Sequence, residues 1–87
     1  MKADQKQITR LLKTARGQID GIIKMIEDDR YCIDISNQIM ATQAILKRAN
    51  KEIICAHMQH CVHDAIGSKD ADLKIEEMMN IINQLMK

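Results

Sequence analysis

A chain of 87 residues has room for one small domain, and a domain of this size buries only a modest fraction of its surface alone. Its formal net charge of +1 excludes a strongly basic or acidic protein, so any role with nucleic acid must come from how the charges are distributed. With no Pro, three Gly, no Phe or Trp and one Tyr, the composition argues against a turn-rich β protein. We therefore expect residues 1–87 to form a single all-α domain that gains stability by association.

The cysteines and the hydrophobic runs indicate the compartment. The cysteine count is three, an odd number, and no apolar leader precedes these residues. A reducing cytoplasm, with thiols free for metal or redox chemistry, is the expected setting. The apolar runs are too short to cross a membrane, so no membrane partner is expected.

The first helix is predicted over residues 5–27, where apolar residues recur at helical spacing. These are Ile8, Leu11, Leu12, Ala15, Ile19, Ile22, Ile23 and Ile26. The other face carries basic residues interrupted only by Asp20, namely Lys2, Lys6, Arg10, Lys13, Arg16 and Lys24. Such a row is usually a solvated face. In a symmetric oligomer every copy repeats it, which favours contact with DNA phosphates.

A break at residues 28–30 precedes a second helix predicted over residues 31–66, about 50 Å long at 1.5 Å per residue. It is apolar on more than one side, which is typical of a central helix. Lys47, Arg48 and Lys51 add a basic cluster near its middle. Gly67 and Ser68 are expected to end this helix.

A third helix is predicted over residues 71–86. Its packing face comprises Leu73, Met78, Ile81, Ile82 and Leu85. The methionines of this helix lie on the ordinary apolar repeat, so we interpret them as core residues rather than copper ligands.

Three residues of the second helix suggest a metal site. His57 and Cys61 are four apart, so they lie one turn apart on one helix face and could bind the same ion. Cys32 shares their azimuth to within about 40°, but a continuous helix would hold it about 37 Å from His57. The alternative is that all three are core residues on an apolar stripe, since free Cys is often simply buried.

A second copy of the helix, running antiparallel about a two-fold axis, reconciles the shared azimuth with the distance. The midpoints of the pairs 32/57 and 32/61 lie near residues 44–47, so an axis there brings Cys32 of one chain beside His57 and Cys61 of the other. Such a dimer holds two identical sites.

Two thiolates and one imidazole form a soft, low-coordinate set that favours Cu(I). Zinc would want a fourth ligand, for which His60, His63, a carboxylate or water are candidates. His60 lies about 60° around the helix from His57 and points poorly at the same ion. A catalytic Cys-His pair needs an oriented base and a substrate pocket, for which the sequence offers little, so we do not expect an enzyme.

Five stretches, spread over nearly the whole chain, resemble the CsoR family of bacterial metal-sensing transcriptional repressors. They are residues 16–22 (RGQIDGI), 29–32 (DRYC), 38–39 (QI), 57–61 (HMQHC) and 75–77 (IEE). The resemblance implies a three-helix protomer that pairs through antiparallel helices into homodimers and flat homotetramers. It also implies that operator double-stranded DNA is the partner, and that Cys32, His57 and Cys61 correspond to the Cu(I) ligands of the copper sensors.

The resemblance further assigns Tyr31 and Glu77 to a shell that hydrogen-bonds the metal-bound histidine and couples the site to DNA release. Leu11 stands where several members carry a basic residue implicated in DNA contact, with Arg10 as its neighbour. The DNA-binding residues are then expected to be Lys6, Arg10, Lys13, Arg16, Arg48 and Lys51. Cys55 is additional to the family pattern.

The sequence therefore predicts a Cu(I)-responsive repressor that leaves its operator when copper binds. A persulfide or thiol-redox sensor of the same family, in which Cys32 and Cys61 of opposing chains react, remains an alternative. A zinc-stapled structural dimer is a third.

Overall fold

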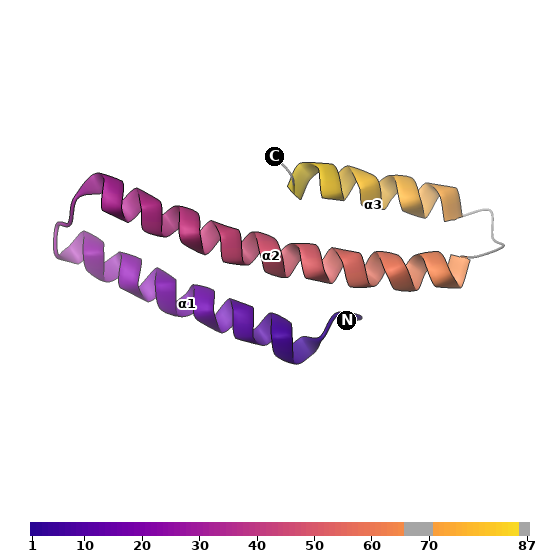
Figure 1. The fold of residues 1–87 in the computed structure, drawn as a ribbon, viewed down its shortest axis with the longest axis horizontal. Helices are drawn as coiled ribbons and strands as arrows, with labels where there is room; N and C mark the ends of the chain where they lie inside the picture. The colour runs from indigo at the N-terminus through magenta and orange to yellow at the C-terminus, as the bar shows by residue number, and fades with distance from the viewer. Residues whose placement is uncertain (66–70, 86–87) are drawn as a thin grey trace.

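The computed structural model describes residues 1–65 and 71–85, and the described part consists of three helices without strands. These are α1 (Gln5–Glu27), α2 (Cys32–Ala65) and α3 (Ala71–Leu85), as Figure 1 shows. The predicted all-α class and the three helices are confirmed. The expected cap at residues 67–68 and the predicted last residues, 66 and 86, lie outside the described residues.

Local signals account for both ends of α1. At its start, the backbone N–H groups of Lys6 and Gln7 donate to the carboxylate of Asp4, at 3.0 and 3.3 Å, which satisfies donors that a helix start leaves without a partner. At its end, the N–H of Asp29 donates to the carbonyl of Ile26 and the N–H of Arg30 to that of Met25. This pair of bonds is a Schellman motif. The break between the first two helices therefore lies where the sequence predicted it.

The three helices lie side by side in one layer, with α2 in the middle (Figure 1). α1 packs along one edge of α2 and α3 along the other, and within the described ranges α1 and α3 do not contact each other. The Cα atoms span 58 × 27 × 11 Å, so the layer is one helix thick. Both broad faces of α2 are consequently left without a covering helix.

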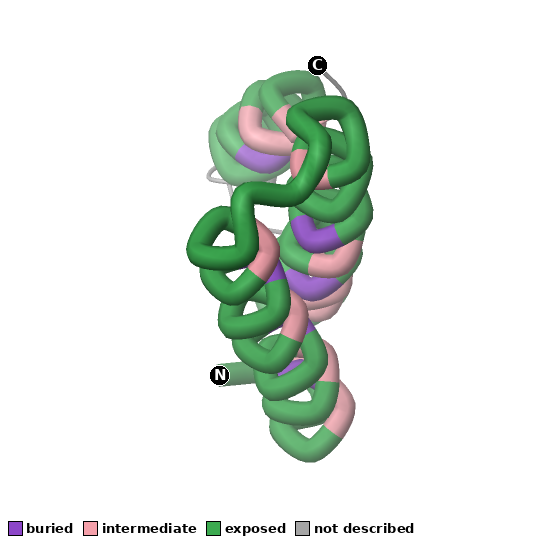
Figure 2. The backbone as a smooth tube through the Cα atoms, turned by 90° about the vertical axis from the view of Figure 1, so that its left-hand side faces the viewer, coloured by how far each residue is buried: buried purple, intermediate pink, exposed green. Residues whose placement is uncertain are grey.

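The core is correspondingly thin, and most of the chain is exposed (Figure 2). Its buried residues follow the helix contacts: Ile8, Ala15 and Ile22 from α1, Thr42 and Ala49 from α2, and Met78 from α3. Thr42 is polar, and its hydroxyl lies 2.8 Å from Oε1 of Gln18 and 3.1 Å from the carbonyl of Gln38. This contact satisfies the buried hydroxyl and links α1 to α2.

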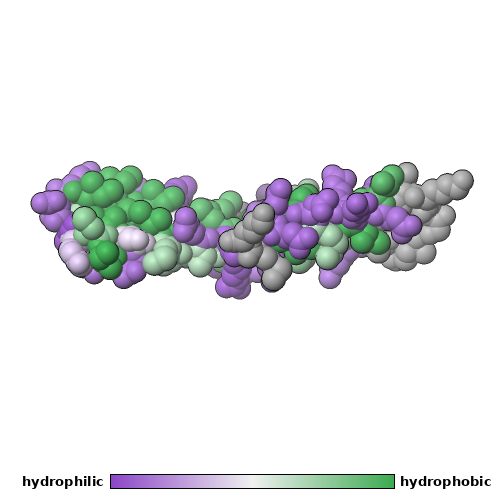
Figure 3. All heavy atoms as spheres, turned by 90° about the horizontal axis from the view of Figure 1, so that it is seen from above, coloured by the Kyte–Doolittle hydropathy of each residue, from purple (hydrophilic) through white to green (hydrophobic). Residues whose placement is uncertain are grey.

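Several residues predicted to pack are exposed. Leu12, Ile19, Ile23 and Ile26 of α1 are exposed, and the prediction that Leu73 packs is wrong within this chain, since 66% of it is accessible. Figure 3 shows hydrophobic side chains over the end of the molecule where α2 begins, where Ile33 and Met40 are exposed. One layer cannot cover these faces.

Among the described helices, none combines the length and the hydrophobicity that crossing a membrane requires.

Candidate metal centre and nucleic-acid interface

The two ligands predicted one turn apart lie together near the end of α2. Sγ of Cys61 is 3.2 Å from Nε2 of His57, because residues four apart on a helix share a face. His57 is exposed and Cys61 is half-buried. The pair therefore presents a sulfur and a nitrogen donor to solvent at one point of the molecule.

Cys32 lies at the opposite end of the same helix. It is the first residue of α2, and it is exposed. Because α2 is continuous from Cys32 to Ala65, about 37 Å of helix separates Cys32 from His57. Within the described residues, no group of three or more His, Cys, Asp or Glu side chains is close enough to bind one metal ion. A single chain thus brings two of the three predicted ligands together.

An exposed apolar stripe connects these two ends. Ile39, Leu46 and Ile53 follow one another at steps of seven residues, which keeps them on one side of a helix. Ile39 is 41% and Leu46 42% accessible, and Ile53 is half-buried. Cys32 and His57 are both exposed, so neither belongs to the core of the single chain.

Tyr31 and Glu77 are both exposed. Tyr31 lies just before α2, where its carbonyl accepts a hydrogen bond from the N–H of Ile35 at 3.2 Å. Glu77 lies on α3, along the edge of α2 that α1 does not cover. In the described part of the chain, neither side chain hydrogen-bonds to His57.

The other thiol and imidazoles point elsewhere or are not described. Nε2 of His60 contacts Oδ2 of Asp64 at 3.1 Å. His60 therefore points away from His57, as its azimuth on the helix predicted. Cys55 is a half-buried free thiol. The side chain of His63 lies outside the described residues.

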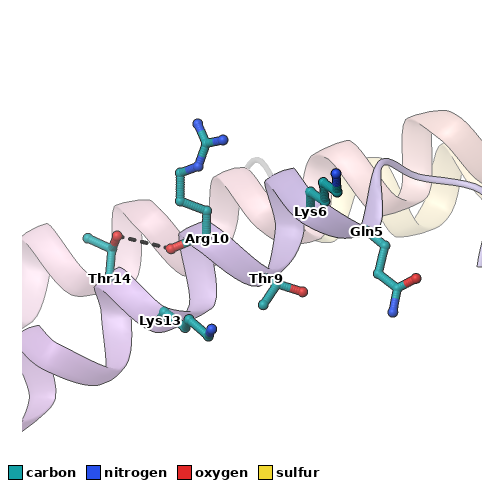
Figure 4. Close-up of a pocket in the computed structure, with 6 residues that line it drawn as sticks. All are labelled: Gln5, Lys6, Thr9, Arg10, Lys13 and Thr14. Atoms are coloured by element: carbon teal, nitrogen blue, oxygen red, sulfur yellow. Dashed lines mark hydrogen bonds between the residues drawn. The ribbon is translucent and has the colours of Figure 1, made fainter.

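Three of the predicted DNA-binding residues line one open hollow on α1. Lys6, Arg10 and Lys13 surround it, together with Gln5, Thr9 and Thr14 (Figure 4). Its volume is about 660 Å³. The hydroxyl of Thr14 donates to the carbonyl of Arg10 at 3.0 Å. The sequence analysis missed the three neutral residues, although Thr9 and Thr14 are three or four residues from basic residues of the hollow and could have been identified by that spacing.

The other three predicted DNA-binding residues do not line this hollow. Arg16 is exposed on α1 but is not among the hollow's residues. On α2, Nε of Arg48 pairs with the carboxylate of Glu52 at 3.3 Å, which partly balances its charge, while Lys51 is exposed. The basic surface is therefore concentrated on the first half of α1.

Comparison with known proteins gives the family. Residues 4–84 match the family model of the metal-sensitive transcriptional repressors. The copper-sensing transcriptional repressor CsoR of Bacillus subtilis is 42% identical over 84 residues, covering 97% of this chain and 83% of its own. CsoR of Mycobacterium tuberculosis is 35% identical over 82 residues, covering 94% and 69%. The chain belongs to the metal-sensitive transcriptional repressors, the family that contains CsoR.

Solved structures agree with this assignment. The copper-sensing repressor CsoR with Cu(I) from Geobacillus thermodenitrificans has a TM-score of 0.77 at 40% identity, covering 94% of this chain and 85% of that one. The nickel-responsive regulator InrS has a TM-score of 0.79 at 20% identity, covering 98% and 96%, and shows the shared fold alone. The resemblance seen in the sequence is confirmed. The family consists of transcriptional repressors rather than enzymes, as predicted.

Proposed function

We propose that this chain is a cytoplasmic repressor that binds operator DNA without metal and is released when Cu(I) binds between two protomers. Cys32 of one protomer and His57 and Cys61 of its partner hold the ion. The observation that carries the proposal is the layout of α2. Two donors lie 3.2 Å apart at one end, the third donor is exposed at the other, and an exposed apolar stripe runs between them. An antiparallel partner covers that stripe and completes two equal sites.

The chemistry of the donors supports copper. Two thiolates and one imidazole suit the soft, low-coordinate Cu(I) ion. The relatives at 35–42% identity are copper-sensing repressors, and one of the similar structures contains Cu(I). Of the candidate fourth ligands for zinc, His60 contacts Asp64 at 3.1 Å and would have to leave it to bind the ion.

The DNA-binding surface is formed by basic residues that each protomer repeats. Lys6, Arg10 and Lys13 form its centre around the hollow of α1, and Arg16, Arg48 and Lys51 extend it. In a homotetramer built from two dimers, four such surfaces act together. A chain of net charge +1 can then bind DNA through concentrated positive charge.

A Cu(I) titration under a competing chelator, without oxygen, tests this function. Binding of a fluorescent operator duplex is followed by anisotropy in the same samples. DNA affinity should fall by about 5- to 150-fold as the sites fill, which is the usual range of coupling between two binding sites. Retention of full DNA affinity with the sites filled contradicts the proposal.

The thiol-switch alternative is tested in parallel. A persulfide donor without copper should leave the DNA complex intact if copper is the inducer. Release by the donor, together with a mass increase on Cys32 or Cys61, would favour that alternative.

A further inference from the structure

The outer face of α1 combines cations with two glycines. Six residues fall within about 80° of one another around an ideal helix, and we call them the α1 row: Lys6, Arg10, Lys13, Gly17, Gly21 and Lys24. The buried residues Ile8, Ala15 and Ile22 lie on the opposite side, against α2. The α1 row therefore faces away from the rest of the chain.

Nothing in the described part of the chain explains the two glycines. A glycine in a helix interior is destabilising relative to alanine, and Gly17 and Gly21 both lie well inside α1. Glycine lets another backbone pack closely, but a Cβ atom added at either position would meet none of the described residues within 4 Å. Both residues are exposed. The bare strip of backbone they create is thus open toward something outside the chain.

The charges around this strip indicate its partner. Lys13 precedes the glycines and Lys24 follows them, while Asp20 at the margin of the row is the only acid between Gln5 and Lys24. From Lys6 to Lys24 the row extends over about 27 Å, the axial length of about eight base pairs. Thr9 and Gln5 line the same hollow as Lys6, Arg10 and Lys13, but Figure 4 shows them pointing to the side of α1 away from Arg10. Cations such as those of the row bind phosphate oxygens.

We propose that the α1 row lies along the sugar-phosphate backbone of duplex DNA, and that the backbone approaches α1 most closely over Gly17 and Gly21. This inference rests on the proposed repressor function and specifies its DNA contact. Because the glycines have no side chain, the DNA backbone can lie close to α1 between the cations. The row then contacts phosphates and sugars and does not distinguish one base sequence from another.

Gly17→Ala and Gly21→Ala test the close approach, because they should change stability and DNA affinity in opposite directions. Each removes a helix-destabilising glycine without a clash, so the Tm should rise by about 4 °C. The added methyl groups should weaken binding of duplex DNA by about tenfold at fixed salt, equally for a random-sequence duplex and for one selected by the wild-type protein. Wild-type affinity in both alanine variants would overturn the inference.

Gly17→Lys separates close approach from charge. If charge alone governed the contact, an added lysine would tighten DNA binding, whereas the proposal predicts weaker binding than wild type. Asn83→Ala is the matched control, since this residue is exposed on α3, at the opposite edge of the layer. It also replaces a poorer helix former by alanine, and its DNA affinity should equal that of the wild type.

Two further measurements distinguish failure of this inference from failure of the proposed repressor function. Native mass should be unchanged in the glycine variants, and a smaller assembly would show that the strip contacts a second copy of the chain, which overturns the inference. Lys13→Ala should lower the slope of log affinity against log salt by about 1. If the wild-type protein binds no duplex, the repressor function itself fails, whereas wild-type binding with unaffected glycine variants removes only this inference.

Discussion

Asp29 shows how one residue fixes the turn between α1 and α2. Its φ is 53°, a left-handed conformation that most side chains avoid and that Asp, Asn and Gly tolerate best. This conformation lets Asp29 and Arg30 donate to the carbonyls of the last turn of α1. The turn brings α2 back along α1 and so sets which face of α1 is covered.

Substitutions at Asp29 should change stability in opposite directions. Asp29→Gly should raise the free energy of unfolding by about 0.5 to 1 kcal/mol, because glycine adopts a positive φ without a Cβ penalty. Asp29→Val should lower it by about 1 to 2 kcal/mol, because a β-branched residue is strained there. Urea unfolding measures both. A similar loss in both variants would mean that the carboxylate, rather than φ, matters at this position.

Tyr31 and Glu77 are proposed to couple the metal site to DNA release. Neither is a ligand, so Tyr31→Phe and Glu77→Ala should keep Cu(I) affinity close to that of the wild type, because thiolates supply most of it. Both variants should bind DNA but stay bound when copper is added, having lost a coupling of about 1 to 3 kcal/mol. Anisotropy with and without Cu(I) measures this coupling. Release as complete as in the wild type would exclude that residue from the switch.

At the scale of the elements, the sequence predicted where the helices lie, but it did not predict which of their apolar residues are buried by neighbouring helices. The bounds of α1 were predicted from its apolar repeat and the acidic break, and the structure adds the Asp4 cap at its start. Which apolar residues are covered depends on neighbours that a helical repeat does not specify, so the exposure of Leu73 and Ile26 was not foreseen.

In the candidate site, too, contacts within one helix could be predicted from the sequence, whereas contacts between elements or chains could not. The contact between His57 and Cys61 follows from spacing within one helix, and the structure has their atoms 3.2 Å apart. The proposed contact of Cys32 with His57 and Cys61 of another chain depends on how the chains assemble. The sequence constrains that arrangement only through the direction in which each residue leaves the helix. Arg16 lies beyond the basic hollow, whose lining residues all fall between Gln5 and Thr14 of α1.

The apolar stripe of α2 gives a test of association. Leu46 lies next to the proposed two-fold axis and is 42% exposed in the single chain, so Leu46→Glu should change the fold of one protomer little. In the dimer it places two like charges side by side in an apolar contact, and the dissociation constant should rise at least about tenfold. Analytical ultracentrifugation measures this change.

Asn37→Glu provides the matched control. Asn37 is exposed and lies about 180° around α2 from Leu46, so the same charge there should leave the assembly unchanged. Equal effects of the two substitutions, or none from Leu46→Glu, would contradict the proposed interface.

At the scale of the molecule, the flat layer explains why the proposed site is shared by two chains. A layer one helix thick leaves α2 uncovered on both broad faces, because α1 and α3 pack along its two edges. In the proposed dimer, association buries the apolar stripe and joins the two ends of α2 in the same step. The proposal thereby links metal binding to the geometry of the assembly, and through it to the spacing of the basic surfaces proposed to contact DNA.

Mixing two inactive variants tests the shared site most directly. Cys32→Ala and Cys61→Ala protomers, each alone, should lack tight Cu(I) binding. Unfolded together and refolded, they should form mixed dimers with one complete site, in which the Cys32 of one protomer meets the His57 and Cys61 of the other, and one site without either thiolate. Chelator competition should then show tight Cu(I) binding that neither variant has alone, at one ion per mixed dimer. If mixing restores no tight binding although mixed dimers are detected by native mass, or if either variant alone binds as tightly as the wild type, the shared site is contradicted.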